Sequence, residues 1–304
     1  MKTTKYYIAA ISAFITWGLF SLVLKPIHDY PSLDILFFRV FSCGILMVLI
    51  ALLFKRKQIK ETIEIFNSLS KLEKRKSVLL NIGGSAFLMG NWFTFIYVVN
   101  HVSVKAASLA YLVCPILTTL LAYFLLKEKL LKTQWLSVGL SISGCVLLSY
   151  SDIMDMFFSI IIGLTYAAYL VSQRANKRFD KFIVLTFHIT LAALCLLPFY
   201  PSYGGPVPTE FKFYFCIETI AIIFTIVPLF LNLYALSGIN SSTVGMLLNI
   251  NPMIAFGLAA FVFKENITPL QITAYGIIFA AVLVFNSHHI FALKQKFTSI
   301  SKGS

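Results

Sequence analysis

The sequence predicts an all-α integral membrane protein, with ten transmembrane helices arranged as two inverted five-helix repeats. Composition is the first reason. Of the 304 residues, 59% are hydrophobic and 12% are charged, whereas soluble domains carry about 25% charged residues. The second reason is a series of apolar stretches long enough to cross a bilayer. The third is a constant offset at which residues of the first half recur in the second.

Ten apolar stretches approach the roughly 20 residues that a helix needs to cross about 30 Å of hydrocarbon. They cover residues 7–24, 35–54, 78–99, 107–126, 135–150, 156–173, 182–200, 213–236, 243–263 and 271–291. Polar or proline-containing connections separate most of them, at Lys25-Pro26, Pro31, Lys127-Glu128, Asp152, 201–208 and Pro269. The first stretch lacks a small-residue cleavage site, so we interpret it as a retained span and not as a signal peptide.

The long connection between the second and third stretches, residues 55–76, has a pattern of its own. Apolar residues recur there at helical spacing between basic residues, at Ile59, Ile63, Phe66, Leu69 and Leu72. This pattern is typical of a short amphipathic helix lying on the membrane surface. An ordinary solvated loop helix is the alternative.

Positive charge is distributed unevenly between the two sides of the predicted bundle. With the N-terminus inside, nearly all Lys and Arg residues fall on the inner side, as the positive-inside rule requires. The exceptions are Lys25, Lys105, Lys212 and Lys264 outside and Arg39 within a span. We therefore expect a multi-pass protein of the plasma (inner) membrane with both termini cytoplasmic. The net charge of +13 then reflects orientation and the anionic inner leaflet, not a nucleic-acid partner.

Pro115 and Pro252 mark an internal repeat with an offset of 137 residues. The same offset relates Tyr97 to Tyr234, Ala122 to Ala259, Phe124 to Phe261, Glu128 to Glu265, Gln134 to Gln271 and Gly139 to Gly276. We expect one five-helix repeat over residues 1–150, a second over 151–292 and a cytoplasmic tail over 293–304. Because five is odd, the second repeat enters the membrane from the opposite side. Inverted repeats of this kind are typical of transporters and place the binding site between them.

The two repeat-related prolines lie midway along apolar stretches. A proline inside a helix removes one N–H donor and frees the carbonyl four residues earlier, here those of Tyr111 and Leu248. Such groups must be satisfied within the protein or by a watery cavity. We therefore predict helix breaks at Pro115 and Pro252 that face the interior, with plain kinks as the alternative.

Motifs spread over nearly the whole chain support a resemblance to a known family. They are Ile15-Thr16-Trp17-Gly18, Leu36-Phe37-Phe38-Arg39, Gly90-Asn91-Trp92, Phe95, Asn100, Ala107-Ser108-Leu109-Ala110-Tyr111, Pro115, Glu128, Gln134-Trp135-Leu136, Val227-Pro228-Leu229, Ser242-Thr243-Val244-Gly245, Pro252 and Glu265. With them the chain resembles the EamA group of the drug/metabolite transporter superfamily, and within it the RarD branch. The resemblance implies a ten-helix inverted-repeat fold and export or exchange of small metabolites.

The chain departs from that family pattern in two ways. Lys127 and Lys264 stand where a glycine usually precedes the loop glutamate. Cys114 stands where an asparagine commonly precedes the fourth-span proline, which removes a polar wall residue.

Ionisable residues inside the predicted spans are candidates for function, because charge is costly in hydrocarbon. Arg39 suits an anion site or an inter-helix clamp, with snorkelling as the alternative. His188 is a candidate binding residue that could instead be a packing histidine. Glu218 is a candidate for proton coupling. Glu128 and Glu265 end their helices beside lysines and are interpreted as gates or caps.

Polar and aromatic residues near the midplane complete the predicted binding site, because a small ligand needs orienting groups in an otherwise apolar pocket. The predicted substrate-binding residues are Trp17, Arg39, Asn91, Trp92, Tyr111, Tyr166, His188, Asn249 and Asn251. The predicted site contains no metal ligands and no catalytic residues.

We interpret the chain as a permease that moves a small metabolite, amino acid or drug-like compound by efflux or exchange through alternating access. Its partners would be that small-molecule substrate and the lipid bilayer, without a cofactor. Protons as a coupling ion, exchange and facilitated diffusion stay open, as does the oligomeric state. The alternatives are a non-transporting scaffold or sensor and a membrane-embedded transferase. The five histidines are scattered without paired carboxylates, which argues against an enzyme.

Overall fold

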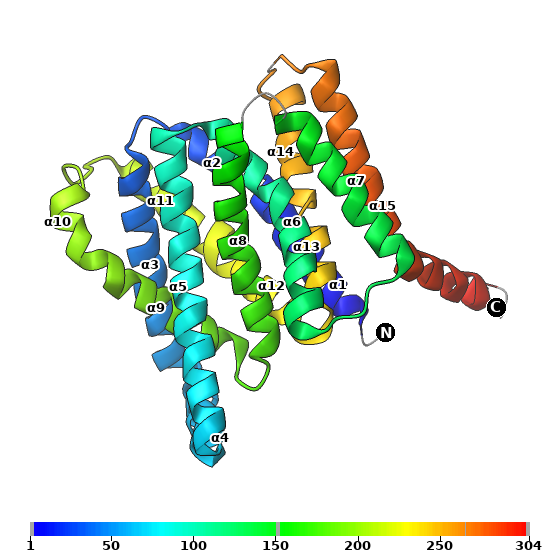
Figure 1. The fold of residues 1–304 in the computed structure, drawn as a ribbon. Coiled ribbons are helices and arrows are strands. Elements are labelled where there is room, and N and C mark those ends of the chain that lie inside the picture. The colour runs from blue at the N-terminus through cyan, green and yellow to red at the C-terminus, as the bar shows by residue number, and fades with distance from the viewer. Residues whose placement is uncertain (1–2, 150–152, 265, 302–304) are drawn as a thin grey trace.

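A computed structural model describes residues 3–149, 153–264 and 266–301, and the described part of the chain is helical without strands (Figure 1). Within that part, nine segments are long and apolar enough to cross a membrane. The prediction of an all-α integral membrane protein is confirmed. The short helix α4 projects from one end of the bundle and α10 lies at the other (Figure 1). These ends are called the α4 end and the α10 end below.

The first half of the chain forms seven α-helices and one 3₁₀ turn. They are α1 (Thr4–Gly18), α2 (Phe20–Leu24), the turn η1 (Lys25–Ile27), α3 (Ser32–Phe54), α4 (Arg56–Ser68), α5 (Lys71–His101), α6 (Val104–Leu126) and α7 (Lys132–Ser149).

The second half forms eight α-helices and two turns of other helical types. They are α8 (Ile153–Ala175), α9 (Lys181–Leu196), the 3₁₀ turn η2 (Leu197–Phe199), α10 (Tyr200–Tyr203), α11 (Phe211–Ala221), the π-helical turn η3 (Ile222–Ile226), α12 (Val227–Gly238), α13 (Ser241–Leu247), α14 (Ile250–Phe261) and α15 (Pro269–Ser301).

Helix α7 corresponds to the expected fifth span, 135–150, and is not among the nine apolar segments. It begins with polar residues and has 18 residues in its described part. It packs along α15 (Figure 1), where the Ser137 hydroxyl donates a hydrogen bond to the Ala281 carbonyl at 2.6 Å. At Gly144 a Cβ would lie 2.6 Å from Cγ1 of Ile278, so glycine permits this close approach. A count of ten spans therefore stays a prediction.

The repeat-related prolines have different effects on their helices. The span 241–261 is interrupted between α13 and α14, and the Leu248 carbonyl accepts a hydrogen bond from the Asn251 N–H at 3.0 Å. Helix α6 instead continues through Pro115, so the predicted break there is wrong. The reason is packing, because α6 lies closely along α8. At Gly163 of α8 a Cβ would lie 3.2 Å from the Ala110 carbonyl.

The connection 55–76 contains the predicted helix, which the structure places at α4. Ile63 and Ile65 on this helix are 53% and 37% exposed. Leu72 belongs to the next helix, because Ser70 and Glu73 form a capping box that begins α5 at Lys71, and such boxes satisfy free N–H groups at a helix start. Whether α4 lies on the membrane surface stays a prediction.

The two lysines that stand in place of glycine before the loop glutamates occupy an unusual backbone conformation. Lys127 and Lys264 have φ values of 56° and 53°, the only positive values among the described non-glycine residues. Lys127 ends α6 in this left-handed conformation, and the N–H of the next residue, Glu128, donates to the Ala122 carbonyl at 3.2 Å. Glycine adopts that conformation without a steric penalty, so the lysines hold a backbone shape that favours glycine.

The largest apolar cluster lies in the middle of the bundle and draws on both halves. It contains buried residues of α1, α3, α5, α6, α8, α9, α11, α12 and α13, among them Phe14, Cys114 and Tyr166. Trp17 and Trp92 pack against it. Three of the predicted binding residues, Trp17, Trp92 and Tyr166, therefore lie in or against a core that joins the two halves of the chain.

Candidate functional site

At the α4 end, Glu128 connects the two halves of the chain. Its Oε1 accepts hydrogen bonds from the N–H and hydroxyl of Ser241 at 2.9 and 2.8 Å. Its Oε2 accepts from the N–H and hydroxyl of Ser242 at 3.1 and 2.7 Å. The Glu128 side chain is 8% exposed. A carboxylate is well suited to this position, because it satisfies free N–H groups at the start of α13.

Arg174 at the end of α8 extends this cluster. Its Nη1 donates to the Leu236 carbonyl at 2.6 Å and its Nη2 to Oδ1 of Asn240 at 3.2 Å. Its Nε lies 3.9 Å from Oε1 of Glu128. We call Glu128, Arg174, Ser241 and Ser242 the Glu128 cluster. It joins the ends of α6, α8 and α12 to the start of α13.

The contacts at the α10 end involve aspartates. The Asp34 carboxylate accepts a hydrogen bond from the Gly205 N–H at 2.8 Å. The Ser103 hydroxyl donates to Asp155 at 2.6 Å, and Lys105 lies 3.9 Å from the same carboxylate. Glu265, the repeat partner of Glu128 and the second predicted gate or cap, lies outside the described residues.

Arg39 lies in the second turn of α3, and its guanidinium carbon is 5.1 Å from the centre of the Trp92 ring. This distance suits a cation–π interaction. Arg39 makes no hydrogen bond or ion pair with any residue that the structure describes, and its Nε is buried without a partner. Its two terminal nitrogens retain accessible surface.

Tyr111 of α6 lies within electrostatic range of Arg39, and its ring centre is 5.8 Å from that of Phe95. The Tyr111 hydroxyl and the Trp92 indole N–H make no hydrogen bond with a described residue, and neither is fully buried. Arg39, Trp92 and Tyr111 come from three consecutive spans of the first half, and their polar atoms remain available to a ligand.

Unlike Trp92, Trp17 already has a hydrogen-bond partner, because its indole N–H donates to the Phe224 carbonyl at 2.8 Å. Pro228 has no N–H for the carbonyl four residues earlier, which is that of Phe224. Trp17 supplies a donor to this carbonyl and so connects α1 to the π-helical turn η3. Such turns are frequent at functional sites.

Tyr166 and Asn91 also make contacts between helices. Asn232 donates from its side-chain amide to the Tyr166 hydroxyl at 2.8 Å, and the Tyr166 ring meets that of Trp17 edge-on at 6.0 Å. Asn91 donates to the Ile162 carbonyl at 3.0 Å and to the Thr165 hydroxyl at 3.3 Å. These side chains hold α8 against α12 and α5, so their amide N–H groups and the Tyr166 hydroxyl already have partners within the protein.

The remaining predicted binding residues differ in how far their side chains are exposed to a ligand. His188 and Asn249 are fully buried at 0% exposure. His188 packs edge-on against the Tyr169 ring at 5.7 Å, and neither of its ring nitrogens has a partner among the described residues. Asn251 is 9% exposed and makes no side-chain hydrogen bond with the described part of the chain. Its amide, unlike that of Asn249, keeps accessible polar atoms.

Glu218 of α11, the candidate for proton coupling, contacts α3 at Ser42 and forms no ion pair with Arg39. Its carboxylate accepts a hydrogen bond from the Ser42 hydroxyl at 2.7 Å. Ser42 lies one helical turn after Arg39 on α3. Among the described residues, no group of three or more His, Cys, Asp or Glu side chains could hold a metal ion.

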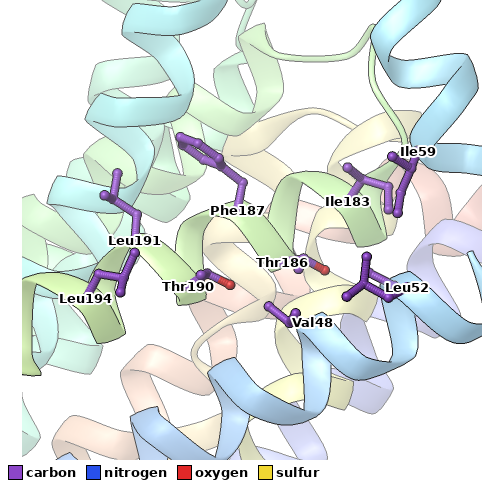
Figure 2. A pocket seen from close by; sticks show the side chains of 10 residues that line it. Val48, Leu52, Ile59, Ile183, Thr186, Phe187, Thr190, Leu191 and Leu194 are labelled. Carbon is purple, nitrogen blue, oxygen red and sulfur yellow. The ribbon is translucent and has the colours of Figure 1, made fainter. Parts of the chain in front are cut away.

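A groove of about 360 Å³ opens between α3, α4 and α9 and is lined almost entirely by apolar groups (Figure 2). Leu52 of α3, Ile59 of α4 and Phe187 of α9 point into it (Figure 2). None of the predicted binding residues lines this groove. It therefore lies apart from the polar and aromatic residues discussed above.

Sequence reasoning missed three groups that the structure brings into the site. Ser241 and Ser242 bind Glu128, Arg174 joins them, and Asn232 binds Tyr166. Asn232 lies inside a predicted apolar span, and a polar residue at such a place signals an internal hydrogen bond. Arg174 carried no comparable signal, because it follows a span among other basic residues.

Comparison with known proteins agrees with this architecture. The model of the EamA-like transporter family matches residues 4–150 and 154–287. "Uncharacterized transporter YojE" of Bacillus subtilis is 26% identical over 93% of this chain and 94% of its own length. "Protein RarD" of Escherichia coli is 23% identical over 97% and 98%, respectively.

A solved structure described as "Crystal structure of protein" has the same fold, with a TM-score of 0.72 and 14% identity. It covers 92% of this chain, which covers 96% of that one. With the family match to both halves and the apolar helices of the bundle, the chain is a multi-pass membrane protein that belongs to the EamA-like transporter family.

Proposed function

We propose that this protein is a secondary transporter that moves a small metabolite, amino acid or drug-like compound across the bacterial inner membrane by alternating access. Efflux and exchange are the proposed directions. Family membership supports transport, and the offset of 137 residues between the halves supports two inverted repeats. The distribution of Lys and Arg supports a cytoplasmic position for both termini and for the α4 end.

The Glu128 cluster is the single observation that carries the mechanism. It joins an element of the first half to the start of α13 through four hydrogen bonds. In the proposed orientation these bonds hold the cytoplasmic end closed. Opening that end requires the carboxylate to separate from both serines, so Glu128 acts as a gate. The interruption between α13 and α14 lies within the same span and would let its two parts move separately.

Reconstitution into proteoliposomes tests this proposal. Radiolabelled amino acids, nucleosides and amphenicol drugs are followed with and without a pH gradient, which also tests proton coupling. A variant with Glu128→Cys and Ser242→Cys, in a background without the five native cysteines, tests the gate by cross-linking. Its reduced form is the control. Oxidation is expected to stop flux and reduction to restore it. Flux that persists after complete cross-linking would refute the gate, and absence of flux for every compound class would favour the scaffold alternative.

A further inference from the structure

Arg39 is a cation inside a membrane-spanning helix, and it has no counterion among the residues that the structure describes. Its Nε is buried and unpaired, and no described carboxylate lies within ion-pair distance. Two acids on or beside α3 have other partners, because Asp34 accepts from the Gly205 N–H and Glu218 from the Ser42 hydroxyl. An unpaired charge is costly inside the membrane. A bound anion would offset that cost.

The groups around Arg39 can donate hydrogen bonds, and the Tyr111 hydroxyl can also accept one. The Trp92 ring lies 5.1 Å from the guanidinium carbon, and its indole N–H has no partner in the described part of the chain. Tyr111 brings a hydroxyl that is likewise free of partners among the described residues. An indole is a donor only and a guanidinium has no acceptor. A ligand at this place must therefore supply acceptor atoms together with negative charge.

The single positive charge of Arg39 and the apolar cluster beside Trp92 limit the class of ligand that fits the site. Arg39 is the only Lys or Arg residue well inside the predicted spans, so the site matches a monoanion better than a phosphate dianion. A planar guanidinium pairs with a carboxylate through two parallel hydrogen bonds. Trp92 also packs against the central apolar cluster, which includes Tyr166 and is lined by Trp17. The apolar or aromatic part of such a ligand would pack against those rings.

The geometry points to a carboxylate subsite formed by Arg39, Trp92 and Tyr111, which selects substrates that carry one carboxylate on an apolar body. Arg39 pairs with the carboxylate, and the Trp92 ring covers the guanidinium. Tyr111 donates a third hydrogen bond. This inference rests on the proposed transport function, because it names the chemical class that the transporter would carry.

Three matched probes test the subsite on the full chain in nanodiscs: 3-phenylpropionate, its neutral amide and 2-phenylethylamine. Binding is followed by thermal stability and by quenching of tryptophan fluorescence. We expect the carboxylate to raise the melting temperature and the amide to bind at least about tenfold more weakly. The amine is expected not to bind. Equal responses to carboxylate and amide, or no response to the carboxylate, would overturn the subsite.

Arg39→Gln should abolish the preference for carboxylate over amide. Because it removes an unpaired charge, it should leave the ligand-free melting temperature unchanged or higher, which separates lost binding from lost folding. Arg56→Gln, which changes an exposed arginine at the start of α4, is the matched control and should keep the preference. A preference that survives in Arg39→Gln would contradict the inference.

Flux measurements separate this inference from the proposed function. Carboxylate binding that depends on Arg39, without flux in proteoliposomes, would support the subsite and contradict transport. Flux of neutral compounds that is insensitive to Arg39→Gln would support transport and overturn the subsite.

Discussion

The carboxylate of Glu128 accepts hydrogen bonds from both the backbone N–H and the hydroxyl of Ser241, at 2.9 and 2.8 Å. Ser241 lies 113 residues away in the second half of the chain. Ser242 repeats the same pair of contacts on the other carboxylate oxygen. One side chain thereby satisfies two N–H groups of a helix start that no intrahelical carbonyl can reach.

Glu128→Ala should destabilise the protein by roughly 2–4 kcal/mol, because it leaves buried donors of Ser241, Ser242 and Arg174 without their acceptor. Thermal unfolding in detergent measures the change. Glu61→Ala is the control, since Glu61 forms an exposed pair with Lys57 at 3.8 Å and such pairs contribute less than about 1 kcal/mol. Similar losses in the two variants would show that the Glu128 contacts add nothing beyond surface charge.

Gly245→Ala should lower stability by about 1–3 kcal/mol, because overpacking forces neighbours apart. A Cβ at Gly245 would lie only 2.7 Å from Cβ of Thr118, where α13 packs on α6. Gly257→Ala in α14 is the matched control, with nothing within 4 Å of its new Cβ. It should be neutral or stabilising by up to about 1 kcal/mol through helix propensity. The packing argument fails if the two variants unfold at the same temperature.

Lys127→Gly should raise stability by about 1 kcal/mol, because it relieves a left-handed residue with a side chain. The gain is partly offset by the greater freedom of glycine in the unfolded chain. Lys129→Gly nearby removes the same charge from a position without a positive φ, and it should lower stability slightly. Melting temperatures of both variants measure the difference, and a lower value for Lys127→Gly would contradict this account.

Trp17→Phe should cost about 1–2 kcal/mol, because the Phe224 carbonyl loses the donor that replaces the missing N–H of Pro228. Trp135→Phe is a suitable control, since Trp135 is 39% exposed and its indole N–H makes no hydrogen bond with the described residues. Chemical unfolding followed by circular dichroism reports both. If the control loses as much as Trp17→Phe, the hydrogen bond to Phe224 has no special weight.

The two repeat-related prolines show that a local sequence pattern does not by itself predict a helix break. Pro115 and Pro252 occupy equivalent positions in the sequence repeat, yet only the span with Pro252 is interrupted. The loss of one N–H is the same in both. The outcome differs because α6 packs mainly along α8, whereas α13 packs mainly on α6 and α14 mainly on α1. Packing against other helices therefore decided whether a proline broke its span.

The sequence by itself determined the class of the fold, since hydrophobic stretches of this length can be satisfied only as membrane helices. It also indicated the family, through motifs such as Gly90-Asn91-Trp92, and identified Glu128 and Arg39 as unusual. The tertiary structure decided which polar side chains were already in use. Asn91, Trp17 and Tyr166 bind other helices, whereas Arg39, Trp92 and Tyr111 keep polar atoms that have no partner among the described residues. Hydrogen bonds between residues so distant in the chain depend on how helices meet, which no local pattern specifies.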